Sequence, residues 1–91
     1  MQLRWTAEAA SDLERIADYL FQHAAGRAPE MLRVIYAAPA TLLTFPNRGR
    51  PGKRKDTREL VLTHLPYIVV YTVRDDIVFV VRILHGAQQW P

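Results

Sequence analysis

The chain has 91 residues, a length that fits one small domain and excludes two-domain and barrel enzymes. Hydrophobic residues make up 49% of it and charged residues 23%, as in globular proteins and unlike disordered tails. The absence of cysteine excludes a disulfide framework, a thiolate metal site and a cysteine nucleophile. The sequence also lacks a signal-peptide core and a run of about 20 apolar residues. We therefore expect a single domain over 1–91, located in the cytoplasm.

The net charge of +3 is distributed unevenly. Residues 46–58 carry six basic side chains against Asp56, which gives +5, and the rest of the chain sums to −2. These basic residues are Arg48, Arg50, Lys53, Arg54, Lys55 and Arg58. A block of one sign predicts an anionic partner, either a phosphate backbone or an acidic protein segment. The alternative is a solvated loop whose charges only aid solubility.

The N-terminal half predicts one short strand, from Gln2 to Trp5, and a helical hairpin. Thr6 is a suitable N-cap for a first helix over 7–24, which we expect Gly26 to end. Its apolar residues recur every three or four positions. The exposed face is predicted to carry Asp12, Glu14, Arg15 and Asp18.

A second helix is predicted over 29–45, with Pro29 in its first turn. Pro39 removes one backbone hydrogen bond from this helix, so we expect a bent or two-piece element. Pro46, Gly49, Pro51 and Gly52 then mark a loop that carries the basic residues.

The C-terminal half predicts three strands, over 57–62, 67–73 and 77–84, with a tight turn at Arg74-Asp75-Asp76. The last two strands are apolar at nearly every position, so both faces of their sheet should be covered. The helices can cover one face, and a partner chain is one candidate for the other. The tail from His85 is too polar for another strand. The predicted fold is α+β, in the order β-α-α-β-β-β, with a helical hairpin on one antiparallel sheet.

Few side chains are candidates for chemistry. The three histidines lack metal-ligand spacing, and no glycine-rich loop precedes a helix, so neither a metal nor a nucleotide cofactor is expected. Arg82, Arg58 and His85 remain. Arg82 lies within an apolar strand, where its charged head must reach water, a carboxylate or a ligand. The alternative for Arg58 is an ordinary edge-strand charge paired with Glu59 or Asp56, and the alternative for His85 is a structural hydrogen bond. We expect these three to line one concave site beside Lys53–Lys55.

Several motifs resemble the RelE/ParE superfamily of toxins from type II toxin–antitoxin systems. They are Arg-Trp-Thr-x-x-Ala-x-x-Asp-Leu at 4–13, Phe-Pro-x-x-Gly-Arg-Pro-Gly at 45–52, Arg-Glu-Leu-Val at 58–61, Leu-Pro-Tyr-Ile-Val-Val-Tyr at 65–71 and Arg-Ile-Leu-His-Gly-Ala-Gln-Gln-Trp-Pro at 82–91. The resemblance covers essentially the whole chain, in order. It implies the fold predicted above and a cognate antitoxin that forms a hetero-oligomer with the toxin.

The resemblance leaves two activities open. RelE-like members cut mRNA at the ribosome without a metal ion, and ParE-like members inhibit DNA gyrase without cutting RNA. The basic loop favours the endoribonuclease. In that case Arg58 and Arg82 would stabilise charge on the phosphate and His85 would act as acid or base. Arg48, Arg50, Lys53, Arg54 and Lys55 would bind RNA. Either activity implies growth inhibition and, in some systems, plasmid stabilisation.

Overall fold

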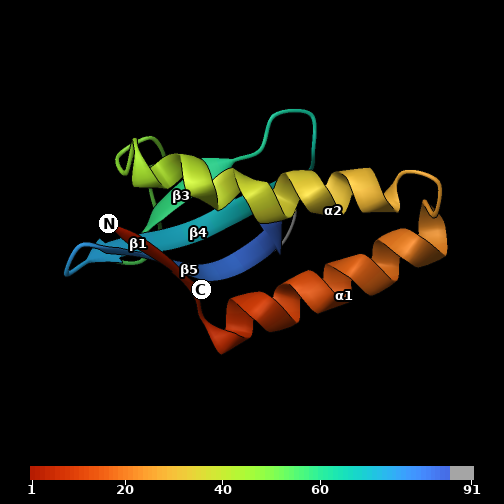
Figure 1. Ribbon diagram of the computed structural model, residues 1–91, viewed down its shortest axis with the longest axis horizontal. Coiled ribbons are helices and arrows are strands. Elements are labelled where there is room, and N and C mark those ends of the chain that lie inside the picture. The colour runs from red at the N-terminus through yellow and green to blue at the C-terminus, as the bar shows by residue number, and fades with distance from the viewer. Residues whose placement is uncertain (87–91) are drawn as a thin grey trace.

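The computed structural model describes residues 1–86. Its elements follow the chain as a strand, two helices with a 3₁₀ extension, and four strands (Figure 1). Their bounds are β1 Gln2–Trp5, α1 Ala7–His23, α2 Ala28–Ala37, η1 Ala38–Leu43, β2 Arg50–Pro51, β3 Arg58–Val61, β4 Tyr67–Arg74 and β5 Ile77–His85. The α+β class is confirmed, with two helices on a five-stranded sheet. Most of the polar tail, residues 87–91, lies outside the described residues.

The sheet has the order β1-β5-β4-β3-β2. The last four strands in sequence are antiparallel neighbours, whereas β1 runs parallel to β5. The prediction of a wholly antiparallel sheet was therefore wrong at this edge, because β1 lies beside the last strand rather than the next one along the chain. The strand β2 was also missed. Two residues among prolines and glycines resemble a loop, and only pairing with Arg58 and Glu59 makes them a strand.

The first helix begins as predicted. The Thr6 hydroxyl accepts a hydrogen bond from the Ala9 amide at 3.1 Å, and Glu8 lies in the first turn, where the helix dipole favours an anion. The helix ends at His23, and the Ala24 amide still donates to the Leu20 carbonyl. Gly26 does not end it through a left-handed conformation, because no described glycine has a positive φ. The backbone turns at Ala24 instead.

The second helix changes its winding at the predicted proline. Pro29 lies in the first turn of α2, and Pro39 lies at the start of η1. Proline has no amide proton, so the α-helical ladder cannot continue through Pro39, and the chain tightens into a 3₁₀ segment. Figure 1 shows α1 and α2 meeting at their connecting turn and spreading apart towards the sheet.

The main core lies between the helices and one face of the sheet. Ala9, Ile35 and Leu42 on the helical side pack with Val69, Tyr71, Val78 and Val80 on the sheet, all fully buried. A smaller cluster of Val70 and Leu84, with Ile68 and Val81 beside them, lies on the other face. Apolar residues on both faces of β4 and β5 agree with the continuous apolar runs in the sequence.

Two local features shape the hairpin of β4 and β5. Asp75 and Asp76 both have positive φ, the backbone of a two-residue type I′ turn that matches strand twist. The register shifts by one residue between Val70 and Tyr71, which pair with Arg82 and Val80. Val81 is therefore an extra residue in β5, and such a bulge bends the strand.

Candidate functional site

The basic residues of 46–58 form an exposed surface around β2. Arg48, Arg50, Lys53, Arg54 and Lys55 are all exposed. Arg50 is paired with Glu59 at 2.9 Å, and Arg48 donates to the Thr41 hydroxyl at 3.1 Å. The Arg54 carbonyl accepts from the amide and the hydroxyl of Thr57, which folds the loop back towards β3. The positive charges that the sequence concentrates in 46–58 are therefore on the surface.

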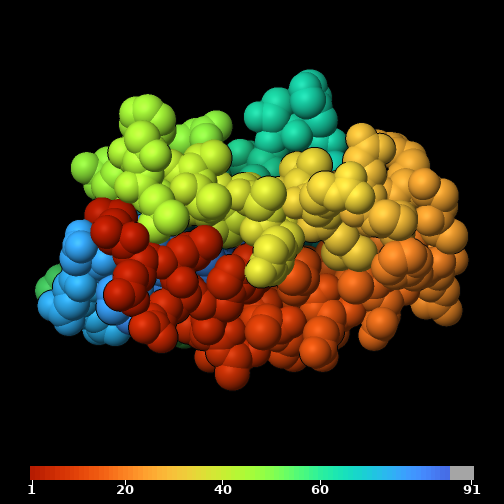
Figure 2. All heavy atoms as spheres, in the orientation of Figure 1, coloured from red at the N-terminus to blue at the C-terminus, as the bar shows by residue number. Residues whose placement is uncertain are grey.

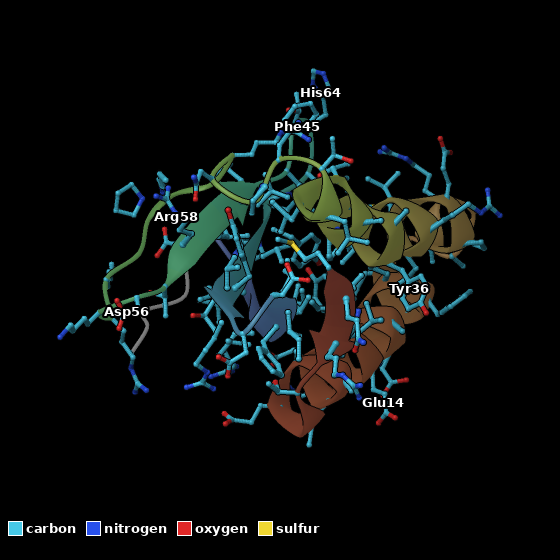
Figure 3. The ribbon with its side chains drawn as sticks, turned by 60° about the vertical axis from the view of Figure 1, so that its left-hand side comes forward. Glu14, Tyr36, Phe45, Asp56, Arg58 and His64 are labelled. Carbon is cyan, nitrogen blue, oxygen red and sulfur yellow. The ribbon has the colours of Figure 1, made fainter. Side chains whose placement is uncertain are left out.

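Arg58 lies at the inner margin of this surface and holds the loop before β2. Its Nη1 donates to the Gly49 carbonyl at 2.7 Å and more weakly to the Asn47 carbonyl at 3.4 Å. The ion pair with Glu59 or Asp56 that we considered for Arg58 is not formed, since Glu59 pairs with Arg50. Arg58 and Arg74 line a cavity of about 450 Å³ with Asp56. Figure 3 shows Arg58 and Asp56 far from Tyr36 and Glu14 on the helices.

The side chain of Tyr71 also holds the loop before β2. Its buried hydroxyl donates to the Pro46 carbonyl at 2.7 Å and accepts from the Gly49 amide at 2.9 Å. A Cβ on Gly49 would lie 2.7 Å from the Tyr71 ring, so this position requires glycine. Tyr71 and Arg58 together set where the chain enters β2.

The Arg82 guanidinium is paired with a carboxylate of the same chain. Its Nε donates to Asp12 Oδ2 at 2.7 Å and its Nη2 to Oδ1 at 3.0 Å, a bidentate pair. Arg15 also contacts Asp12, and the Ile83 amide donates to Oδ2 at 2.9 Å. The hydrogen bonds with Asp12 raise the pKa of the Arg82 guanidinium above its ordinary value. Of the outcomes we considered for Arg82, the structure forms the carboxylate pair.

The prediction made for Asp12 from the sequence was wrong. We expected it on the exposed face of α1, and it is 2% exposed against β5. The spacing held a clue, since Asp12 lies three residues after Ala9 and four before Ile16, within the apolar stripe. An isolated carboxylate is costly to bury, and its charge is compensated here by Arg82 and Arg15.

His85 lies at the end of β5 beside a different cavity. Its ring meets Tyr67 edge-on, with 5.7 Å between ring centroids. The cavity, about 340 Å³, is lined by Asp12, Arg15, Ile16, Tyr19, Tyr67, Ile83 and His85. Burial raises the pKa of the Tyr67 hydroxyl above its usual range, with a smaller contribution from Tyr19. Tyr67 is therefore neutral at physiological pH and is not a base there.

The register separates the three residues that we expected in one site. Arg58 is paired with Tyr71 and lies on the helix-covered face, while Arg82 is in register with Val70 on the opposite face. His85 pairs with Tyr67, four residues along β4 from the partner of Arg58, which is about 13 Å of strand. Arg58 and His85 line separate cavities. The expected common concave site is therefore not formed by these three side chains.

Other kinds of site find little support in the described part of the chain. Residues 1–86 contain no cluster of three or more histidine, aspartate or glutamate side chains that could hold a metal ion. No helix there is long and apolar enough to span a bilayer. An apolar groove of about 720 Å³ does run between α1 and α2. Trp5 and Tyr36 form part of its wall, and their rings are stacked with 5.6 Å between the ring centroids.

Comparison with known proteins identifies the family. Residues 3–90 match the model of the ParE toxin of the type II toxin–antitoxin system parDE. A putative toxin, Y4kP, from Sinorhizobium fredii is 38% identical over 90 residues, covering 99% of this chain and 93% of that protein. Toxin RelE2 from Caulobacter vibrioides is 38% identical over 87 residues, covering 96% and 97%.

A solved structure agrees with these matches. The chromosomal ParDE toxin–antitoxin system from P. aeruginosa contains a chain that is 26% identical, with a TM-score of 0.81. The match covers 93% of this chain and 95% of that one. The resemblance found in the sequence motifs is confirmed, and the chain belongs to the ParE toxin family of type II toxin–antitoxin systems.

Proposed function

We propose that this toxin acts by binding and inhibiting DNA gyrase, without cutting RNA. The observation that carries the proposal is the pairing of Arg82 with Asp12. Both oxygens of this buried carboxylate are bonded to the guanidinium, so its charge is compensated inside the fold. A phosphate could reach the remaining Arg82 donor, Nη1, only beside Glu8, whose Oε2 lies 3.9 Å from it. To take the bidentate side of Arg82 it would have to displace Asp12, which would then be left buried with Arg15 and the Ile83 amide as its partners.

The separation of Arg58, Arg82 and His85 supports the same proposal. Cleavage by an adjacent 2′-hydroxyl needs a base, an acid and cations around one phosphate. A toxin that acts by binding needs a surface that contacts its target instead of acid–base groups. Two such surfaces are present, the groove between α1 and α2 and the basic residues of 46–58. Neutralisation then requires only that a cognate antitoxin cover part of that surface. Gyrase acts in the cytoplasm, where this proposal puts the toxin.

The second candidate is the ribosome-dependent mRNA endonuclease predicted from the sequence. It is favoured by the exposure of the RNA-binding candidates Arg48, Arg50, Lys53, Arg54 and Lys55. In this candidate Arg58, Arg82 and His85 remain the catalytic residues, and the Arg82–Asp12 pair opens when mRNA binds in the ribosome.

Two assays on one preparation separate the candidates. The toxin, released from its antitoxin complex, is added to gyrase with relaxed plasmid and to programmed ribosomes with a 5′-labelled mRNA. We expect inhibition of supercoiling and intact mRNA. Cleavage of mRNA without inhibition of gyrase would overturn the proposal and establish the second candidate.

A variant adds an internal control. His85→Ala removes the acid or base of the second candidate, and we expect it to leave gyrase inhibition and growth arrest unchanged within about twofold. Loss of growth arrest in His85→Ala, with antitoxin binding intact, would contradict gyrase binding as the cause of toxicity. Growth arrest with neither gyrase inhibition nor cleavage would reject both candidates.

A further inference from the structure

The loop between β2 and β3, residues 52–57, is closed by its own hydrogen bonds. The Gly52 amide donates to the Thr57 carbonyl at 2.8 Å, and the amide and hydroxyl of Thr57 donate to the Arg54 carbonyl. A Cβ on Gly52 would overlap the Thr57 hydroxyl oxygen, so the closed loop requires glycine there. The three exposed basic side chains of 53–55 are therefore presented together at the tip of a compact loop.

A cavity of about 450 Å³ lies beside this loop and contains two arginines. Residues at both ends of the loop line it, together with Arg58 at the start of β3 and Arg74 at the end of β4. The Thr72 hydroxyl donates to the Asp56 carbonyl at 2.8 Å, which ties the loop to β4 at this place. Two strands and a basic loop therefore bring their cations to one hollow of the surface.

The Arg58 guanidinium is anchored through one nitrogen. Its Nη1 donates to the carbonyls of Gly49 and Asn47, at 2.7 and 3.4 Å. Within residues 1–86, no hydrogen bond or ion pair involves its Nε or Nη2. The anchored nitrogen fixes the position of the guanidinium, and the other two nitrogens keep donors for the oxygens of an anion.

Arg74 is held by a ring and keeps its charge. Its guanidinium carbon lies 5.7 Å from the centroid of the Phe79 ring, and no carboxylate of residues 1–86 forms an ion pair with it. Asp75 and Asp76 follow it in the turn, but neither lines the cavity, and Asp76 pairs with the N-terminal ammonium at 3.3 Å. The ring contact orients the guanidinium and leaves its N–H groups for a ligand.

Asp56 carries the opposing charge in this cavity. It is exposed, and Figure 3 shows it in the loop that leads into β3, on the same side of the molecule as Arg58. Its carboxylate faces two arginines of the cavity and three basic side chains of the adjacent loop tip. The balance is positive, so the cavity favours an anion, and Asp56 weakens that preference.

The arrangement fits a row of phosphates better than a single carboxylate. Arginine N–H groups pair with phosphate oxygens, and a basic loop tip beside the cavity can contact the neighbouring phosphates of the same strand. Single-stranded RNA is usually recognised by stacking on aromatic side chains, and no aromatic residue among 1–86 lines this cavity. Gyrase holds duplex DNA while it works, so a toxin bound to gyrase meets a DNA backbone.

We propose that this cavity binds a backbone phosphate of the duplex DNA that gyrase holds. Arg58 and Arg74 donate to the phosphate oxygens, and the basic side chains of 53–55 contact the phosphates beside it. The toxin then binds the enzyme and its DNA together, and reads no base sequence, because contacts to phosphate carry none. The proposal rests on gyrase being the target of the toxin.

The direct test measures toxin binding to gyrase with and without a DNA duplex. Arg58 also holds the loop before β2, so Arg74→Gln is the variant of choice. Arg27→Gln removes the same charge at the α1–α2 turn, which Figure 2 shows in orange at the opposite end of the molecule from the light-blue β4–β5 turn. We expect DNA to tighten binding of the unmodified toxin and of Arg27→Gln alike. Arg74→Gln should bind DNA-bound gyrase about three- to tenfold more weakly, with a salt dependence lower by about one ion, and DNA-free gyrase as before.

A gain of affinity keeps the proposal falsifiable if Arg74→Gln perturbs the fold. Asp56→Asn removes the opposing charge, and asparagine tolerates the positive φ of this residue. We expect about two- to fivefold tighter binding to DNA-bound gyrase and no change without DNA. Unchanged affinities of both variants would overturn the proposal. An equal loss for Arg74→Gln with and without DNA would also overturn it, since the arginine would then contact an acidic surface of gyrase, and so would displacement by single-stranded RNA but not by duplex DNA.

The outcome is separable from the proposed target. If the toxin inhibited gyrase while Arg74→Gln and Asp56→Asn behaved like the unmodified toxin, the phosphate site would be wrong and the gyrase proposal would stand. If the toxin did not inhibit gyrase but bound a DNA duplex more weakly as Arg74→Gln and more tightly as Asp56→Asn, the phosphate site would stand and the gyrase proposal would fail.

Discussion

At each side of this sheet, part of a strand extends beyond its edge neighbour, and the two sides differ in what covers the backbone there. Beyond β1, the edge of β5 is sealed by the first helix: the Thr6 hydroxyl donates to the Val81 carbonyl, and Asp12 accepts from the Ile83 amide. Beyond β2, the edge of β3 at Val61 has no such cover among residues 1–86. One edge is satisfied by the side chains of Thr6 and Asp12, and the other has no partner for the Val61 main chain among residues 1–86.

This difference separates stability from recognition. The sealed edge carries Arg82 and ends beside His85, yet its charges are compensated within the fold. The open edge begins after Glu59, whose charge is paired with Arg50, and lies next to the exposed basic residues of 46–58. We therefore expect a substitution at the β5 edge to reduce the free energy of unfolding more than substitutions beside β3.

Removing Asp12 should have the largest effect. Asp12→Ala leaves Arg82 without its bidentate partner and the Ile83 amide without an acceptor in a buried setting. Breaking a buried ion pair by deleting one partner costs about 3–5 kcal/mol. Urea unfolding measures the loss, and Asp18→Ala, exposed on the same helix, should change stability by less than about 0.5 kcal/mol. Equal losses in the two variants would show that Asp12 does not seal this edge.

Removing the Tyr71 hydroxyl should have an intermediate effect. Tyr71→Phe deletes a buried donor to the Pro46 carbonyl and the acceptor of the Gly49 amide, which together fix the loop before β2. Two unsatisfied backbone groups predict a loss of about 1–3 kcal/mol in unfolding free energy. Tyr36→Phe is the control, because Tyr36 is 64% exposed and its hydroxyl makes no hydrogen bond in residues 1–86. A loss below that of Tyr36→Phe would remove Tyr71 from this role.

The smallest effect is expected at the partly exposed pair of Arg50 and Glu59. Arg50→Ala should reduce unfolding free energy by less than about 1 kcal/mol, because the Arg50 side chain is 60% exposed and the pair is screened. Most of that difference should disappear in about 1 M salt, where the Debye length is near 3 Å. Lys53→Ala is the control, because Lys53 is exposed and forms no ion pair within residues 1–86. A loss as large as that of Asp12→Ala would erase the distinction between the two edges.

The amino-acid sequence by itself determined the parts that depend on neighbours along the chain. The spacing of apolar residues gave α1, Thr6 gave its start, Pro39 gave the change to η1, and alternating or continuous apolar runs gave β3, β4 and β5. The concentration of positive charge in 46–58 and its exposure also follow from composition. The ordered series of motifs was sufficient to find the toxin family.

Only the tertiary structure decided what depends on register and on distant contacts. Asp12 and Arg82 are 70 residues apart, so only the folded chain shows that the guanidinium pairs with a buried carboxylate. Strand pairing puts Arg58 and Arg82 on opposite faces, because side chains alternate along a strand and one step of register changes the face. The early end of β2, which leaves Val61 open, is likewise set by how the loop is held by Tyr71 and Arg58.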